Sequence, residues 1–123
     1  MEEINTRRIE LWKIYRTGVH NSNLEVMDPP DRCDHNGHLF FVKTRSVASR
    51  PRLIQHLRSQ GIGASFHYIP LHSAPFGQKI AKPGMPCPVT EDHAARLLRL
   101  PLYTSLTAAE IERVVRSVNA FDD

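Results

Sequence analysis

The stretch HLFFVKTRSVASRPRLIQHLRSQGIGASFHY, residues 38–68, decides the fold class of this chain. Its first seven residues are rich in aromatic and β-branched side chains, which favour a β-strand over residues 38–44. Ser49 can cap the helix that we expect over residues 50–60, because a serine hydroxyl accepts from first-turn amides. Gly61 follows directly and is suited to the left-handed turn that ends many helices.

A second strand is predicted at residues 62–68, IGASFHY, from the alternation of its side chains. On this prediction four side chains share one face of the strand: Ile62, Ala64, Phe66 and Tyr68. Gly63, Ser65 and His67 point to the other face, and the strand should stop by Pro70. The stretch is therefore expected to form a strand, a helix and a second strand.

Helices are predicted on both sides of this central stretch. Apolar residues recur between charged ones over residues 4–15, which indicates an amphipathic helix that ends at Gly18. A later helix is expected over residues 91–98, capped by Thr90. Thr107 begins a capping box, TAAE, before a last helix. That helix should bury five side chains: Ile111, Val114, Val115, Val118 and Phe121.

Two further segments complete the expected order of elements. Residues 21–37 contain prolines, aspartates and an Asn-Gly pair, which predict a loop, as does KPGMPCP at residues 82–88. LRLP, residues 98–101, allows a short third strand. We therefore expect an α+β domain with a small sheet of two to three short strands flanked by helices, and the sheet could be antiparallel or mixed.

Composition narrows the functional classes. The chain has 123 residues, 41% of them hydrophobic and 24% charged, which suits one globular domain. Its apolar runs are too short to span a bilayer and no leader-like segment opens it, so we expect a cytoplasmic protein without membrane contact. The net charge of +3 is scattered, without a basic run interleaved with aromatics, so nucleic acid is not an expected partner.

Cysteine and histidine residues offer a possible but incomplete metal site. Cys33, His35 and His38 are close in the sequence, and thiolate and imidazole both suit zinc. A structural zinc site needs four ligands at recurring spacing, and neither Cys87 nor His93 is well placed to be the fourth. We therefore expect no metal. The sequence also lacks a Gly-x-Ser-x-Gly nucleophile motif and a phosphate loop.

The segment SFHYIPLHSAPFG, residues 65–77, presents the best candidate site. It places two imidazoles and a phenol around a proline, where a simple turn would use small polar residues. The candidate residues are His67, Tyr68 and His72. The alternative is that Tyr68 is a core aromatic, on the face shared with Ile62 and Phe66, and that the histidines are ordinary surface residues.

Three stretches together resemble a known family: GHLFFVKT at residues 37–44, RPRLIQHLRSQGIGASFHYIPLHSAPFG at 50–77 and HAARLLRLPLYTSLTAAEIERVV at 93–115. They are similar to the C-terminal small domain of the DegT/StrS-type sugar-nucleotide aminotransferases, which use pyridoxal phosphate (PLP). The resemblance implies the small α+β domain of fold-type I PLP-dependent transferases over residues 19–123. Residues 1–18 are similar to the helix that links the family's large and small domains, so Leu11, Trp12 and Tyr15 are expected to need cover from a large domain.

The resemblance also implies site residues. The family's small domain carries a His-aromatic step followed by a second histidine, which His67, Tyr68 and His72 match. It implies that His67 lies near the sugar and the cofactor, that Tyr68 donates a hydrogen bond to the nucleotide diphosphate, and that His72 supports them. Adjacent strand residues point in opposite directions, so the strand must break near His67 for these roles to hold.

For the whole protein, the resemblance implies a PLP-dependent homodimer that transfers an amino group from glutamate to C4 of a dTDP-4-keto-6-deoxyhexose, for lipopolysaccharide or common-antigen sugars. The family's Schiff-base lysine belongs to its large domain, and no lysine here matches that motif: Lys13, Lys43, Lys79 and Lys82. We therefore expect a fragment that is inactive alone and binds no PLP itself. The alternative is a free-standing, non-catalytic ligand-binding or interaction module of the same fold.

Overall fold

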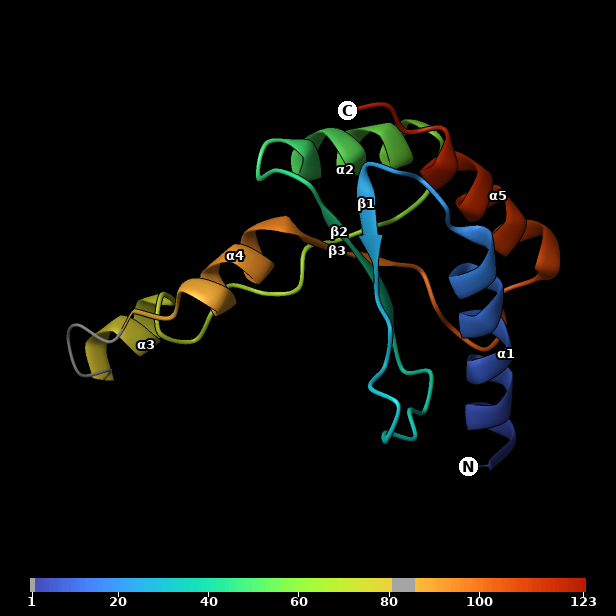
Figure 1. The fold of residues 1–123 in the computed structure, drawn as a ribbon, viewed down its shortest axis with the longest axis horizontal. Coiled ribbons are helices and arrows are strands. Elements are labelled where there is room, and N and C mark those ends of the chain that lie inside the picture. The colour runs from blue at the N-terminus through green and yellow to red at the C-terminus, as the bar shows by residue number, and fades with distance from the viewer. Residues whose placement is uncertain (1, 81–85) are drawn as a thin grey trace.

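The computed structural model describes residues 2–80 and 86–123 of the chain (Figure 1). The elements follow in this order: α1 (Glu2–Gly18), β1 (Leu24–Val26), β2 (Phe40–Thr44), α2 (Ser49–Ser59), α3 (Pro75–Ile80), α4 (Pro88–Arg96), β3 (Leu97–Leu100) and α5 (Ala108–Asn119). The strands form one antiparallel sheet in the order β1-β2-β3. The prediction of an α+β fold with a small sheet is confirmed, and the sheet is antiparallel rather than mixed. Among the described residues, every helix is too short or too polar to cross a membrane.

Strand β2 is the centre of the sheet, and its alternation sets the core. Phe40, Val42 and Thr44 point inward and are fully buried. Phe40 lies opposite Leu100 of β3, and Val42 lies opposite both Val26 of β1 and Leu98 of β3. Because side chains alternate along a strand, the apolar residues of these three short segments collect on one face, which the helices cover.

Helix α1 packs against the sheet and α5 within this chain. The Tyr15 ring stacks on Phe40 with 5.0 Å between ring centroids, and its hydroxyl donates to the Pro101 carbonyl oxygen at 2.8 Å. Leu11, Trp12 and Tyr15 are all buried. The expectation that this face depends on a separate large domain is therefore wrong, because β2 and the segment after β3 already cover it.

The second predicted strand, residues 62–68, does not form. Only Ser65 joins the sheet, through an isolated antiparallel bridge to Arg99 of β3. Ile62 is buried, but Phe66 is 45% and Tyr68 60% exposed, so the alternation does not describe a buried face. The strand that lies beside this segment, β3, is four residues long and ends before a proline. It therefore offers too few backbone groups to pair with all of residues 62–68.

Strand β1 lies inside the segment that was predicted as a loop. Leu24 and Val26 pair with the far end of β2, and Leu24 is buried. A strand of three residues is too short to show an alternating pattern in the sequence. Pairing with β2, and not local propensity, therefore forms this strand.

The helix boundaries confirm some capping predictions and correct others. Thr107 and Glu110 form the predicted capping box of α5. Ser49, however, is the first residue of α2, and the hydroxyl of Ser46 accepts from its backbone amide at 3.1 Å. Helix α4 begins at Pro88, before the predicted cap Thr90, because proline fits the first turn of a helix. It ends at Arg96, where the chain enters β3.

The last helix and the α3–α4 region complete the fold. Ile111, Val114, Val118 and Phe121 are buried as predicted, whereas Val115 is only partly buried. Helices α3 and α4 form an arm that projects from the sheet, away from α1 and α5 (Figure 1). The loop predicted at residues 82–88 lies mostly outside the described residues.

Candidate substrate-binding site

The candidate segment leaves the sheet immediately before its two aromatic rings. The Ser65 amide donates to the Arg99 carbonyl oxygen at 3.2 Å, and the Arg99 amide donates back at 2.8 Å. A turn follows at Pro70, whose carbonyl oxygen accepts from the Ser73 amide at 3.0 Å. His67 and Tyr68 therefore lie on a short link held at both ends by backbone hydrogen bonds. The break near His67 that the proposed roles require is present.

His67 is positioned by Arg99. Nδ1 of His67 lies 3.2 Å from Nη1 of Arg99. A guanidinium can only donate, so Nδ1 accepts and Nε2 carries the proton of the neutral ring. Burial lowers the pKa of His67, and the positive charges of Arg99 and His38 lower it further. This imidazole is therefore held neutral, with a defined acceptor side and a defined donor side.

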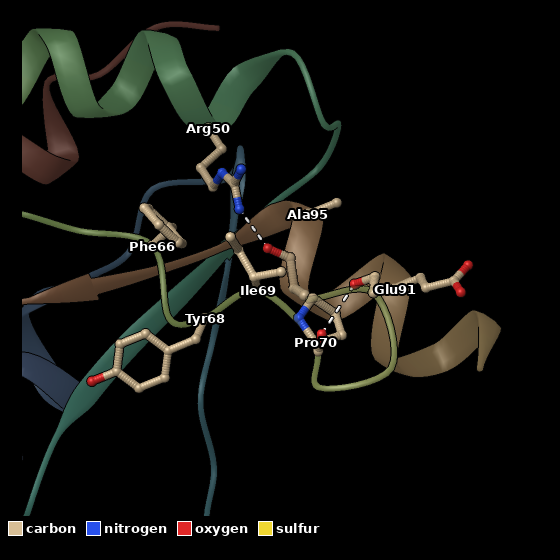
Figure 2. Close-up of a pocket in the computed structure, with 9 residues that line it drawn as sticks. Arg50, Phe66, Tyr68, Ile69, Pro70, Glu91 and Ala95 are labelled. Carbon is tan, nitrogen blue, oxygen red and sulfur yellow. Dashed lines mark hydrogen bonds between the residues drawn. The ribbon is translucent and has the colours of Figure 1, made fainter. Parts of the chain in front are cut away.

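Tyr68 is an exposed ring that stacks on its neighbour. The ring centroids of His67 and Tyr68 are 3.8 Å apart, with an interplanar angle of 27°. Tyr68 is 60% exposed, so the alternative that it is a core aromatic is wrong. The ring of Tyr68 points away from Arg50 (Figure 2). Tyr68 is therefore not packed in the core.

His72 connects the segment to helix α4. Its Nε2 lies 3.0 Å from Oε1 of Glu91, which makes an ion pair when the imidazole is protonated. Because Glu91 lies on α4, this contact couples the projecting arm to the turn at Pro70. The structure thus brings His67 and Tyr68 into direct contact, while His72 lies beyond Pro70 in contact with a different helix.

Two cavities flank the segment. One has a volume of about 410 Å³, and Arg50 and Phe66 contribute to its wall (Figure 2). The other, of about 370 Å³, includes His67 and His93. The residues that line both cavities come from the segment and α4: Tyr68, Ile69, Pro70 and Ala94. The segment thus separates two cavities, and cavities of this size are where proteins commonly bind small ligands.

Two arginines that the sequence analysis did not select organise this region. The Arg50 guanidinium donates to the Ala94 carbonyl oxygen and lies over the Phe66 ring, 5.8 Å from its centroid. Arg99 holds His67. The sequence contains a signal for Arg99, because LLRL places a cation between two buried leucines of a strand. Arg50 carries no comparable signal, since an arginine near the start of a helix is usually solvated.

The possible metal ligands of the sequence analysis make other contacts. Cys33 is exposed, and the His35 ring stacks on Trp12 with 4.4 Å between centroids. His35 Nδ1 also accepts from the Gly37 amide at 3.2 Å. In the described part of the chain, no group of three or more candidate ligands could hold a metal ion. His35 instead packs the loop before β2 onto α1.

Comparison with known proteins identifies the family. The family model described as the DegT/DnrJ/EryC1/StrS aminotransferase family matches residues 1–119. The chain belongs to this aminotransferase family. It is similar to the solved structure of S. venezuelae DesV, with 29% sequence identity and a TM-score of 0.86 over 96% of this chain. It is also similar to the aminotransferase TlmJ from Streptoalloteichus hindustanus, with 26% identity and a TM-score of 0.85 over 97% of this chain.

The chain spans about a third of the length of these structures, covering 32% of each. Helicobacter pylori PseC, an aminotransferase involved in pseudoaminic acid biosynthesis, shows the same fold at 20% identity, with a TM-score of 0.82 over 95% of this chain and 32% of its own. The DegT/DnrJ/EryC1/StrS family is PLP-dependent. A putative sugar aminotransferase from Streptococcus pneumoniae, 21% identical to this chain, has PLP and pyridoxamine phosphate forms.

The described residues do not fit a covalently bound PLP. Lys43 is only 15% exposed, and its Nζ lies 2.7 Å from Oε2 of Glu25. This nitrogen is therefore already engaged by a carboxylate, whereas a Schiff-base lysine must present its amine to the cofactor. Lys13 on α1 and Lys79 on α3 are exposed, and none of these three lysines lines either cavity beside Tyr68. Lys82 lies outside the described residues.

Proposed function

We propose that this chain is the C-terminal small domain of a PLP-dependent sugar-nucleotide aminotransferase. In this proposal residues 1–18 are the helix that follows the large domain, and residues 19–123 are the small domain. The specific activity proposed is that of dTDP-4-amino-4,6-dideoxygalactose transaminase, which moves an amino group from glutamate to C4 of a dTDP-4-keto-6-deoxyhexose. The sequence stretches HNGHLFFVK, FHYIPLH and LLRLPL support that specific assignment by their resemblance to this enzyme.

One observation carries the proposal, which is the stacked pair of His67 and Tyr68 at the edge of two cavities. Tyr68 stacks on His67, and three further apolar side chains of the same segment are exposed: Phe66, Ile69 and Leu71. Exposed apolar side chains that gather in one place often mark a binding surface. The pair lies on a segment anchored by Ser65 and by the turn at Pro70. A segment with an anchored backbone and exposed polar groups is suited to orienting a bound substrate.

The proposed role of each side chain follows from its contacts. His67 accepts from Arg99 through Nδ1, so its Nε2–H is the group directed to a sugar oxygen. The hydroxyl of Tyr68 donates to an oxygen of the nucleotide diphosphate. His72 supports both residues through its contact with Glu91, which holds α4 against the segment.

The chemistry of amino transfer lies outside the described residues. When bound, PLP is the group that carries the amino group between donor and acceptor in such enzymes. A large domain would supply PLP and its lysine, and the parent enzyme would act as a homodimer in the cytoplasm. The present chain would orient the sugar nucleotide and exclude water from one side of it.

The direct test uses the complete reading frame that contains these 123 codons. The encoded protein is purified with PLP and supplied with glutamate and dTDP-4-keto-6-deoxyglucose. We expect sugar-dependent formation of 2-oxoglutarate and an amino sugar nucleotide with the amine at C4. Replacing the sugar nucleotide by its UDP-linked counterpart should reduce the rate, which controls for the proposed dTDP preference.

The same experiment can contradict the proposal. A complete protein that binds no PLP and transfers no amino group from glutamate would favour the alternative, a non-catalytic ligand-binding or interaction module. Transfer to a different keto-sugar would retain the aminotransferase and overturn only the named substrate.

A further inference from the structure

Helix α4 contributes to the wall of both cavities beside Tyr68, yet it has no buried side chain to hold it in place. Glu91 and Ala94 line the larger cavity, and His93 and Ala94 line the other. All nine residues of α4 are described, and none of them is buried. The helix belongs to the arm that projects from the sheet (Figure 1). Apolar packing therefore contributes little to its orientation, which leaves polar contacts to fix it.

Arg96, the last residue of α4, joins this helix to the sheet. Its Nε and Nη2 atoms donate to the two carboxylate oxygens of Asp92 at 2.8 and 2.5 Å. Its Nη1 atom donates to the carbonyl oxygens of Thr44 and Arg45 at 3.0 and 3.2 Å, where β2 ends. Nη1 also lies 3.6 Å from Oε1 of Glu25 on β1. One guanidinium group thus connects α4 to two strands.

The surroundings of Arg96 make this connection rigid. The Arg96 side chain is only 16% exposed, so water has little access to its donors. The other carboxylate oxygen of Glu25 lies 2.7 Å from Nζ of Lys43, which holds Glu25 beside Arg96. Bonds that converge on one planar guanidinium group fix direction as well as distance. A rotation of α4 about its base would therefore break several of these contacts together.

Two contacts farther along α4 depend on this orientation. Arg50 of α2 donates to the Ala94 carbonyl oxygen (Figure 2), and His72 contacts Glu91. Glu91 is five residues from Arg96, which corresponds to about 7.5 Å along a helix axis. A small rotation at Arg96 therefore displaces Glu91 more than Ala94, and with it the part of the cavity wall that Glu91 forms.

We propose that Arg96 is a positioning residue that sets the angle at which α4 leaves the sheet, and with it the shape of the two cavities beside Tyr68. Arg96 lines neither cavity, so it acts through α4. The consequence for substrate binding rests on the proposed function, because these cavities flank the candidate segment. The orientation of α4 itself does not depend on that function.

The first test measures the orientation of α4 and needs neither cofactor nor turnover. The 123-residue chain is labelled with ¹⁵N and weakly aligned, and residual dipolar couplings are measured for the amides of α4, β2 and α5. Arg96→Gln should change the couplings of α4 relative to those of β2 and α5, which should stay consistent with each other. Unchanged relative couplings of α4 would overturn the proposal.

Arg16→Gln is the matched control for this measurement. Arg16 also donates two N–H groups to one carboxylate, that of Asp28, at 2.8 and 2.6 Å, but it connects α1 to the chain after β1. This variant should leave the orientation of α4 unchanged. If Arg96→Gln loses the dispersed amide spectrum of a folded chain, Arg96→Lys decides. Lysine keeps the charge but lacks the planar fork, so the couplings of α4 should still change.

The second test uses the complete enzyme. Arg96→Gln should raise the KM for the sugar nucleotide about tenfold, because a misplaced wall binds the substrate less well, and should change kcat little. Arg96→Lys should recover part of this loss, and Arg16→Gln should leave both constants unchanged. An unchanged KM in Arg96→Gln would overturn the positioning role.

A double-mutant cycle with Tyr68→Phe separates positioning from a general loss of stability. Tyr68 and α4 line the same two cavities, so the effect of Tyr68→Phe on KM should be smaller in the Arg96→Gln background than in the unmodified enzyme. Additive effects would contradict the proposal. If the complete protein transfers no amino group, the proposed function fails, and the dipolar couplings still decide whether Arg96 orients α4.

Discussion

Arg99 and His67 are 32 positions apart in the sequence, yet Nη1 of Arg99 lies 3.2 Å from Nδ1 of His67. The contact exists because Ser65 pairs with the backbone of Arg99, which brings the next residues of the segment beside the strand. The backbone bridge thus brings the imidazole to Arg99, which orients it and, after burial, helps to lower its pKa. The predictions below begin from this pair.

Arg99→Gln should raise the pKa of His67. Burial is the largest cause of the lowered pKa and Arg99 is the next, so the variant should recover part of the distance to the ordinary value of about 6.5. A lowered pKa in the folded state favours the neutral form. The associated stability is therefore present above the unfolded-state pKa and lost as pH falls through the folded pKa, a loss that Arg99→Gln should reduce.

The measurement is an NMR titration of the His67 ring proton between acidic and neutral pH. Arg116→Gln removes the same charge at an exposed site and serves as the control. An unchanged pKa in Arg99→Gln would mean that the contact does not act electrostatically on His67.

Tyr68→Phe should weaken sugar-nucleotide binding in the complete enzyme without affecting folding. The ring is retained and only the hydroxyl is lost, at a cost of roughly 1–3 kcal/mol for a bond to a charged acceptor. The effect should appear as a raised KM for the sugar nucleotide with kcat little changed. Because Tyr68 is 60% exposed, urea denaturation should show a stability change within about 0.5 kcal/mol. Unchanged kinetics would remove Tyr68 from the proposed site.

His67→Ala should lower kcat in the complete enzyme. The proposed contact between Nε2–H and a sugar oxygen positions the reacting carbon, and losing it should reduce turnover more than it changes KM. His20→Ala is a suitable control, since His20 lies beside Gly18 and Asn119 at the end of α1. A normal kcat in His67→Ala would indicate that the histidine serves the fold and not the substrate.

Tyr15→Phe should behave in the opposite way to Tyr68→Phe. The Tyr15 hydroxyl is buried and donates to the Pro101 carbonyl oxygen at 2.8 Å, so its loss leaves an acceptor without its donor. The free energy of unfolding should fall by about 1–2 kcal/mol. Urea denaturation of the 123-residue chain measures this, with Tyr68→Phe as the matched tyrosine control. Equal effects of the two substitutions would contradict the contrast in burial.

The 123-residue chain should form no stable covalent adduct with PLP. Lys43 is held by Glu25, while Lys13 and Lys79 are exposed, so any Schiff base at those two should hydrolyse on dialysis. Absorbance spectra before and after dialysis provide the measurement. A stoichiometric band that survives dialysis and disappears on substitution of one particular lysine would show that a lysine of this chain can hold the cofactor.

The residues chosen for the candidate site were only partly accessible to sequence reasoning. His67 and Tyr68 could be selected because imidazole and phenol groups around Pro70 are unusual in a simple turn. The buried Nε of Arg8 could not be anticipated, since on α1 this residue resembles any solvated arginine of an amphipathic helix. The loop before β2 lies against this part of α1, because Gly37 adopts a φ of 61° and approaches the Arg8 backbone.

Local sequence by itself determined α1, α2, α4, α5 and the central strand of this protein, whereas α3 was not predicted. The period of α1, the capping box at Thr107 and the aromatic run of β2 act over a few residues, so they are visible without the fold. Tertiary structure alone decided the rest. Leu24–Val26 forms a strand because it pairs with β2. In residues 62–68 only Ser65 pairs with a strand, because β3 ends after four residues. Strand pairing and side-chain contacts depend on what lies opposite, and the sequence of one segment does not contain that information.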